Sequence, residues 1–302
     1  GWAVVLRDTA AIFVDGRYTL QVRDQVDAAH WRYETRGAGS VTTWLGEHVG
    51  SGQRIGYDPW LHTREWVAQA SEALTRKGAE LSAIDANPVD TVWHDRPAPG
   101  IAPAFPHDEA FAGRSASEKV ADIAAWLTAR RANTLVLTAL DSVAWTLNIR
   151  GSDVSHTPVA LAYAVVHADA RVELFITPEK ADAALRAHMG AAVTVRPRAD
   201  FARALEMEFT GKTVAVDPER AVVAIFAALE AGGATIDAVR DPVVLAKALK
   251  SPAEIAGHKA AQLRDGAALT RFLRWISVEG PKGSETELSA AAPLHDFRRD
   301  TI

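Results

Sequence analysis

The sequence predicts an α/β protein with two tandem copies of one domain, each a mixed sheet flanked by helices, and the first helices of a further domain after them. Short apolar runs typical of strands alternate with longer segments whose apolar residues recur at helical spacing. Residues 52–59 and 211–218 match, with the same Asp-Pro ending, at an offset of 159 positions. The length of 302 residues exceeds one typical domain.

Composition narrows the function classes. A hydrophobic content of 48% supports full cores, and a net charge of −5 with a pI near 6.1 argues against nucleic acid or an anionic membrane as a partner. The absence of cysteine excludes disulfides and thiolate metal sites. This absence fits a reducing cytoplasm, which is the expected location.

The first copy is expected to begin with a hairpin, followed by alternating helices and strands. We expect strands at residues 2–6, 11–14, 31–33, 54–57 and 79–84, and helices at 17–29, 41–49 and 63–76. Asp58 is predicted to cap the last of these helices, with Pro59 in its first turn. Five prolines in residues 87–107 predict a linker.

The second copy repeats the order of hairpin, helix and strand. We expect helices at 115–131, 179–188, 200–209 and 218–231, and strands at 134–138, 160–166, 171–176, 193–196, 213–216 and 234–238. Ser115 and Glu118 fit a capping box, and Asp217 is a predicted cap by analogy with Asp58. Residues 240–250 are predicted to link to a third segment.

The third segment is predicted to hold two helices. Ser251 and Glu254 fit a second capping box, opening a helix that continues to residue 276. Residues 284–287 cap the last helix, which Pro293 is expected to interrupt. The expected core contacts of the first of these helices are Ile255, Leu263, Phe272 and Trp275.

Two places carry side chains suited to binding. Residues 145–158 form an expected loop in which Gly151 permits unusual backbone conformations, and Arg150, Asp153 and His156 are its candidate site residues. The alternative interpretation is a well-capped connection. Arg17, where the first hairpin turns into a helix, suits bidentate binding of a carboxylate or a backbone carbonyl, or is an exposed arginine at a helix start.

A complete catalytic apparatus is not evident in the sequence. The ten histidines form no His-x-His or His-x-x-x-His pair, and neither a Gly-x-Ser-x-Gly elbow nor a phosphate-binding Gly-Lys-Ser/Thr loop is present. We therefore expect neither a catalytic residue nor a metal ion or other cofactor within these 302 residues.

Four segments nevertheless resemble one family in the right order. Residues 13–21 are similar to the Trp-Thr-Asp-Gly-Arg-Tyr segment of the creatinase/prolidase N-terminal domain, with Phe13-Val14 in place of Trp-Thr. Residues 145–158 resemble the second-domain signature of three-domain Xaa-Pro aminopeptidases. Residues 246–255 and 281–287 resemble the entry into the pita-bread catalytic domain of that family.

The resemblance implies removal of the N-terminal residue ahead of proline with two divalent metal ions, usually manganese, which activate a bridging water. The family's metal ligands (two Asp, one His and two Glu) would lie beyond Ile302. Arg17 matches the arginine that binds substrate in the family. The implied division is residues 1–108, a first domain with its front missing, residues 109–240, a second domain, and residues 241–302, the linker and start of the catalytic domain.

The resemblance implies that the chain is a piece of a longer, homodimeric enzyme that acts on proline-containing peptides. On this interpretation residues 1–302 shape the substrate cleft and the assembly of the enzyme, and are inactive alone. Two alternatives stay open. One is a non-catalytic peptidase-like binding module of the histone-chaperone type. The other is a prolidase or creatinase, which the duplicated N-terminal unit disfavours. The next stretch of the reading frame distinguishes them, since only an enzyme needs the metal ligands.

Overall fold

The structure, a computed structural model, describes residues 1–37 and 39–301. Ala38 and Ile302 lie outside the described residues. The described chain forms two compact units. The first unit comprises Gly1–Pro99 and Ala202–Arg240, and the second unit comprises Gly100–Phe201 and Asp241–Ile302. Since these units are a spatial division, the predicted domain limits at residues 108 and 240 stay a prediction.

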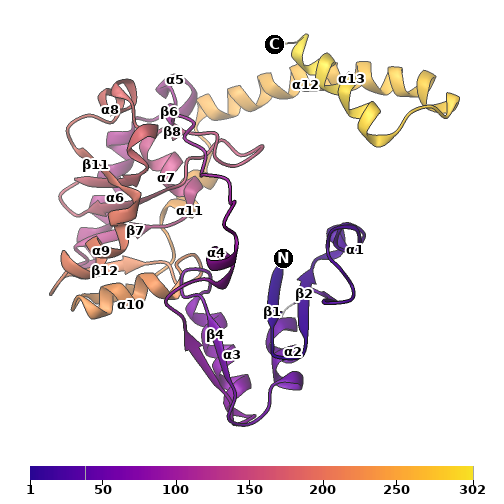
Figure 1. Cartoon of the computed structure of the whole chain (residues 1–302). Helices are drawn as coiled ribbons and strands as arrows, with labels where there is room; N and C mark the ends of the chain where they lie inside the picture. Colours follow the sequence, from indigo (N-terminus) through magenta and orange to yellow (C-terminus); the bar gives the residue numbers. More distant parts are fainter. Residues whose placement is uncertain (38, 302) are drawn as a thin grey trace. The chain divides into compact units, whose positions relative to one another are not determined.

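The first unit starts with the predicted hairpin (Figure 1). The strands β1 and β2 are antiparallel, β3 joins β2 in parallel, and β4 pairs in parallel with β5, so both strand directions are present. The elements of residues 1–99 are β1 (Trp2–Val5), β2 (Ala10–Val14), η1 (Gly16–Tyr18), α1 (Gln21–Gln25), β3 (Arg32–Thr35), α2 (Ser40–His48), β4 (Arg54–Tyr57), α3 (Arg64–Thr75), β5 (Glu80–Ala83) and α4 (Pro88–Val92).

A compact apolar core holds this part of the first unit together. Phe13 of β2 meets Trp44 of α2 edge-on, with 6.1 Å between ring centroids, and Leu74 of α3 is fully buried beside them. Edge-to-face packing of this kind adds to the stabilisation from apolar burial. The hairpin and the two helices therefore pack as the apolar periodicity predicted.

The rest of the first unit contains α9 (Phe201–Met207), of which Phe201 belongs to the second unit, and then β12 (Thr213–Val216), α10 (Val223–Ala231) and β13 (Thr235–Ala238). The strands β12 and β13 are parallel. Thr63, before α3, forms an isolated antiparallel bridge with Val222, before α10. These two residues are separated by the same 159 positions as the matching sequence segments. The two repeated turns therefore pair with each other, which supports the predicted duplication.

The second unit holds a sheet segment with the strand order β11-β10-β9-β7 and helices beside it (Figure 1). The strands β9 and β10 form the second predicted hairpin, β7 is antiparallel to β9, and β11 is parallel to β10. Its elements are β6 (Phe105–Pro106), α5 (Glu109–Ala112), α6 (Ala116–Arg130), β7 (Thr134–Leu137), α7 (Leu140–Leu147), β8 (Ile149–Arg150), β9 (Ala162–His167), β10 (Val172–Ile176), η2 (Pro178–Lys180), α8 (Ala183–Met189), β11 (Val193–Pro197), η3 (Arg198–Asp200), α11 (Val243–Ala248), α12 (Pro252–Glu279), η4 (Gly280–Lys282) and α13 (Glu287–Arg299).

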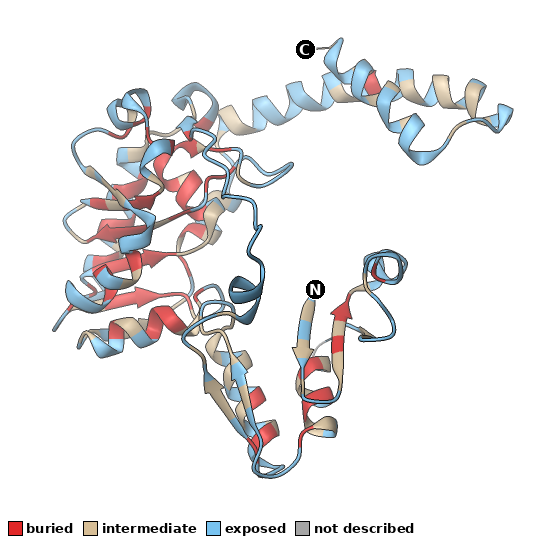
Figure 2. Ribbon diagram, viewed as in Figure 1, coloured by how far each residue is buried: buried red, intermediate tan, exposed pale blue. Residues whose placement is uncertain are grey.

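The strands β7, β9 and β10 of this sheet segment are mostly buried, whereas the edge strand β11 is partly exposed (Figure 2). Every residue of β7 is buried, and Leu174 and Phe175 of β10 are fully covered. The predicted capping boxes are both present: Ser115 exchanges hydrogen bonds with Glu118, and Ser251 does so with Glu254. Each box satisfies two amide groups that a helix start would otherwise leave unpaired.

Several predicted element limits are wrong. The helix expected at residues 17–29 is reduced to η1 and α1, the predicted linker contains α4 and β6, and α11 lies in the segment expected to link to the third helix pair. The helix α7 extends through Leu147 into the expected loop. Pro293 lies inside α13 without ending it, because that helix packs along α12 and the packing compensates for one missing backbone hydrogen bond.

The predicted helix caps Asp58 and Asp217 are also wrong. Thr63 and Val222 are the N-caps of α3 and α10. Each aspartate instead accepts a hydrogen bond from the backbone amide two residues later, at 2.8 Å and 2.9 Å, and so forms an Asx turn. The short side chain bends the backbone locally, which delays the helix by several residues.

The predicted core contacts of α12 are wrong as well. Ile255 and Leu263 are 45% and 77% exposed, and Phe272 and Trp275 stack on each other while only partly buried. Within the described residues, α12 packs mainly against α13, α5 and η4, which cover only part of its circumference.

Candidate functional site

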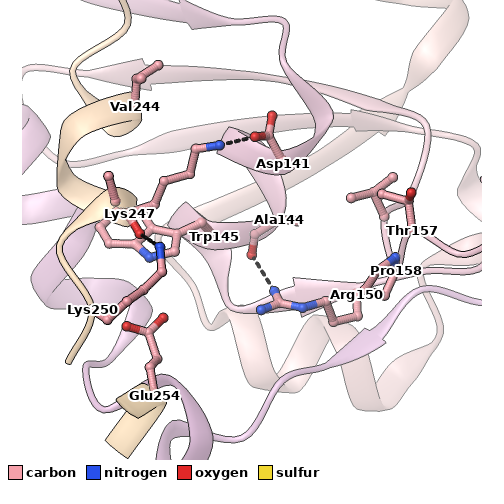
Figure 3. Close-up of a pocket in the computed structure, with 12 residues that line it drawn as sticks. Asp141, Ala144, Trp145, Arg150, Thr157, Pro158, Val244, Lys247, Lys250 and Glu254 are labelled. Atoms are coloured by element: carbon pink, nitrogen blue, oxygen red, sulfur yellow. Dashed lines mark hydrogen bonds and ion pairs between the residues drawn. The ribbon is translucent and has the colours of Figure 1, made fainter. Parts of the chain in front are cut away.

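A hollow of about 430 Å³ lies in the second unit, between α7, β8, the loop after β8, α11 and the start of α12 (Figure 3). Its charged lining residues are Asp141, Arg150, Lys247, Lys250 and Glu254. Its uncharged lining consists of Ala144, Trp145, Thr157, Pro158, Val159, Val244 and Ala248. A partly apolar hollow with a few convergent charged groups has the make-up of a small-molecule site.

Arg150 is the predicted site residue that lies in this hollow. The pairing of β8 with β6 fixes its backbone, and its Nη1 donates hydrogen bonds to the carbonyl oxygens of Ala144 and Ile149, at 3.2 Å and 2.9 Å. Burial lowers the pKa of the guanidinium, and the Glu254 carboxylate opposes that shift. Arginine keeps its charge under such a shift, so Arg150 is a half-buried fixed cation.

Lys119 lies behind the wall of the hollow and holds it in shape. Its buried ammonium donates to the carbonyl oxygen of Trp145 at 3.0 Å and to Oδ1 of Asn148 at 2.6 Å, and it lies 4.2 Å from the Trp145 ring centroid. Asn148 adopts a left-handed backbone conformation at the end of α7. Lys119 therefore ties α6 to the turn that aims β8.

The surroundings of Lys119 disfavour the charged form of its side chain. Burial lowers its pKa to about 8, the nearby Glu254 carboxylate opposes the shift, and Arg150 adds to it. Burial, together with Arg150 and Lys119, also lowers the pKa of His107, which precedes α5. Positive charge is therefore concentrated on this side of the second unit.

The opposite wall of the hollow carries two further lysines. Lys247 of α11 forms an ion pair with Asp141 of α7, and Lys250 donates to the backbone carbonyl of Lys247. Burial lowers the pKa of Lys247, and Lys250 contributes to the same shift. Glu254 accepts a hydrogen bond from the Ser251 amide in its capping box.

The other predicted site residues lie elsewhere. Asp153 forms an ion pair with Lys180, and the two side chains are only 4% and 3% exposed, so this pair anchors the loop after β8. Leu161 donates its amide to the second carboxylate oxygen of Asp153 at 2.7 Å. His156 is exposed, with a positive φ of 60°. Neither Asp153 nor His156 lines the hollow, and their role in a substrate cleft stays a prediction.

Gly151 in this loop is needed for a different reason from the one predicted. Gly151 is not one of the described glycines that have a positive φ. Instead, a Cβ added at this position would lie 2.8 Å from the amide nitrogen of Ala160. The glycine lets two backbone segments approach closely. This approach sets the path of the loop next to Arg150.

Arg17 lies in the first unit, at the start of η1, with its side chain 81% exposed. Its Nε and Nη2 donate to the two carboxylate oxygens of Asp15 at 3.0 Å and 2.8 Å. The hydrogen bonds from Arg17 lower the pKa of Asp15 to about 2. The fork formed by Nε and Nη2 of the guanidinium is therefore occupied by Asp15, and the role of Arg17 in substrate binding stays a prediction.

Sequence reasoning missed the lysines and Glu254 around the hollow. Lys119 follows the capping box of α6 directly, beside the predicted apolar face, and a lysine there has no pattern of its own. Trp145 was within the predicted site segment, but its contact with Lys119 joins α6 to the end of α7. Such pairings depend on tertiary packing.

Comparison with known protein families gives a clear result. The creatinase/prolidase N-terminal domain family matches twice, once over residues 1–92 and once over residues 95–254. The chain belongs to the creatinase/prolidase N-terminal domain family. The two matches confirm the predicted fold class of tandem creatinase-N-like domains.

Relatives of this creatinase/prolidase N-terminal domain protein are named Xaa-Pro aminopeptidases. The chain is 34% identical over 312 residues to a probable Xaa-Pro aminopeptidase P of Neosartorya fischeri, and 34% identical over 317 residues to one of Paracoccidioides brasiliensis. Each alignment covers 99% of this chain, but 47% and 51% of those relatives. The chain therefore spans about half the length of the curated relatives it matches.

A solved structure shows the same likeness. The X-prolyl aminopeptidase of Caenorhabditis elegans, described as a cytosolic enzyme with a di-nuclear active site, matches with a TM-score of 0.86 and 31% identity. The match covers 98% of this chain and 50% of the C. elegans chain. The likeness at this identity confirms the predicted family resemblance.

The described residues do not fit a metal centre of their own. Across residues 1–37 and 39–301, no three His, Asp or Glu side chains gather where they could hold a metal ion. Among the helices of the same residues, none is long and apolar enough to cross a membrane.

Proposed function

We propose that this chain is the N-terminal part of a metal-dependent Xaa-Pro aminopeptidase, which removes the residue preceding proline from the N-terminus of a peptide. The observation that carries the proposal is the match to the C. elegans X-prolyl aminopeptidase, which spans 98% of the chain at a TM-score of 0.86. The curated relatives with the same name align along 99% of the chain and support the same assignment.

The metal chemistry is assigned to the remainder of the whole protein. We propose that two divalent metal ions, most simply manganese, are held by residues outside these 302. The support is the di-nuclear site of the C. elegans neighbour, together with the lack of a suitable cluster among the described residues of this chain. When bound, such ions would activate water and polarise the scissile carbonyl.

The role of residues 1–302 is to shape the substrate cleft and the assembly. Arg17 is proposed to bind the peptide, as the matching arginine does in the family. Asp15 holds its Nε and Nη2, so the guanidinium is oriented before a substrate arrives and Nη1 can donate to a peptide carbonyl or carboxylate. Pre-orientation reduces the entropy lost on binding.

A kinetic comparison tests this role. In the protein encoded by the full reading frame, Arg17→Ala is expected to lower kcat/KM for an Xaa-Pro-Pro tripeptide by about tenfold or more, because a charged hydrogen bond is lost. Metal content should stay normal. Arg17→Lys should recover part of the activity, and Arg7→Ala, another exposed arginine of the first unit, is the matched control. Unchanged kinetics for Arg17→Ala would rule the role out.

The remaining features of the proposal follow the family. We propose a homodimer that acts on proline-containing peptides in the cytoplasm, with the cytosolic C. elegans neighbour as the support for the location. Sedimentation of the full-frame protein tests the dimer. A monomer at micromolar concentration would contradict this part without affecting the proposed reaction.

A further inference from the structure

The guanidinium of Arg150 has an unoccupied edge. Every hydrogen bond that the structure describes for this side chain uses Nη1, which donates to the carbonyl oxygens of Ala144 and Ile149. The parallel N–H groups of Nε and Nη2 make none of these described hydrogen bonds. Among the described residues, no carboxylate lies within ion-pair distance of them. This edge matches the two oxygens of a carboxylate.

The carboxylates that share the hollow are engaged by other groups. Asp141 is paired with Lys247, and Glu254 accepts the Ser251 amide of its capping box. The three cationic side chains of the lining exceed its two carboxylates by one positive charge. One negative charge on a ligand would balance the hollow, whereas a dianion would leave the hollow with a net negative charge.

The arrangement of the walls favours a ligand with an apolar body. Figure 3 shows Arg150 extending from its strand toward the side of the hollow on which Trp145, Lys250 and Glu254 lie. The Trp145 indole supplies a flat apolar surface, and the Lys119 ammonium lies over this ring, 4.2 Å from its centroid. Aromatic surface of this kind contributes substantially to binding when water is displaced from it.

We propose that this hollow is a binding site for a small monocarboxylate with an apolar body. The carboxylate binds the Nε and Nη2 edge of Arg150 with Lys250 nearby, and the body packs on Trp145 and Pro158. The site lies wholly within the second unit, so the proposal does not depend on peptidase activity.

The test is calorimetric titration of the 302-residue chain with 3-phenylpropionate. We expect saturable binding that weakens by tenfold or more in Arg150→Gln and by about threefold in Lys250→Gln, in line with the loss of one charged hydrogen bond and of one nearby charge. Arg274→Gln, an exposed arginine of α12 that does not line the hollow, is the control and should bind as the original chain does.

Two further probes decide the chemistry. The amide of the same acid, which has the same body without the charge, should not bind measurably, and inorganic phosphate should bind more weakly than the carboxylate. Because Arg150→Gln removes hydrogen bonds to two carbonyls, its circular dichroism and thermal unfolding are measured first. If that variant does not fold, Lys250→Gln, whose side chain is exposed, carries the test. The proposal fails if 3-phenylpropionate does not bind, if the variants that fold bind it normally, or if phosphate binds more tightly.

Discussion

Replacing Lys119 by methionine isolates the contribution of one buried cation to the second unit. The side chain is only 2% exposed and donates to Oδ1 of Asn148 and to the Trp145 carbonyl. Methionine fills a similar volume but has no hydrogen-bond donor, so the Trp145 carbonyl oxygen and Oδ1 of Asn148 each lose the bond from Lys119. Each such loss costs about 1–3 kcal/mol, and the lost cation–π contact with the indole costs about 1 kcal/mol more.

One effect opposes this loss. The pKa of Lys119 is lowered to about 8 from an ordinary 10.5, chiefly by burial, so the folded state disfavours the charge. The full shift would correspond to about 3 kcal/mol, and solvent screening reduces it to about half. Removing the charge regains this smaller amount. The net expectation is a free energy of unfolding lower by about 2–5 kcal/mol.

The assay is urea unfolding monitored by hydrogen exchange of the backbone amides of α6. These amides report on the second unit alone. Lys259→Met, an exposed lysine of α12, is the control and should change the free energy by less than about 0.5 kcal/mol. A change in Lys119→Met as small as that of the control would refute the reasoning.

The same variant has a pH signature. Because the folded-state pKa of Lys119 lies below the unfolded value, the unfolded chain binds more protons between about pH 8 and pH 10.5, and stability rises with pH across this window. Lys119→Met should lack that rise. A rise of equal size in both proteins would assign it to other groups.

Two other changes test the packing of the second unit. Hydrogen bonds with His167 and Arg196 lower the pKa of Glu173 from 4.5 to about 2, so its stabilisation is present above pH 4.5 and is lost as pH falls toward 2. Glu173→Gln should therefore reduce the free energy of unfolding at pH 7 by about 1–2 kcal/mol after solvent screening, with a difference that shrinks below pH 4.5 in urea unfolding; a pH-independent difference would contradict the linkage. Gly151→Ala should lower the thermal unfolding midpoint by several degrees, because its Cβ would meet backbone atoms of Ala160 at 2.8–2.9 Å, and an unchanged midpoint would show that the loop yields easily.

Helix starts set by local chemistry could be predicted from the sequence. Ser115 and Ser251 each have a glutamate three positions later, and both capping boxes form. Asp58 and Asp217 had an equally local signal, but an aspartate before proline can form either an Asx turn or a cap. The choice depends on Thr63 pairing with Val222, far away in the sequence.

The site was predictable only in part. Arg150 stood out in a polar segment after an apolar one, and it lies in the hollow. Asp153 stood out for the same reason, but tertiary packing pairs it with Lys180 instead. Lys247 and Glu254 reach the hollow from α11 and α12, about 100 residues along the chain from Arg150, and no local pattern records such an approach.

The most direct test of the proposed function is hydrolysis of an Xaa-Pro-Pro tripeptide by two proteins: the product of the full reading frame and residues 1–302 alone. We expect manganese-dependent release of the first residue by the full-frame protein, abolished by a chelator and restored by manganese, and no release by residues 1–302. Manganese-dependent cleavage by residues 1–302, or no cleavage by the full-frame protein with manganese bound, would contradict it.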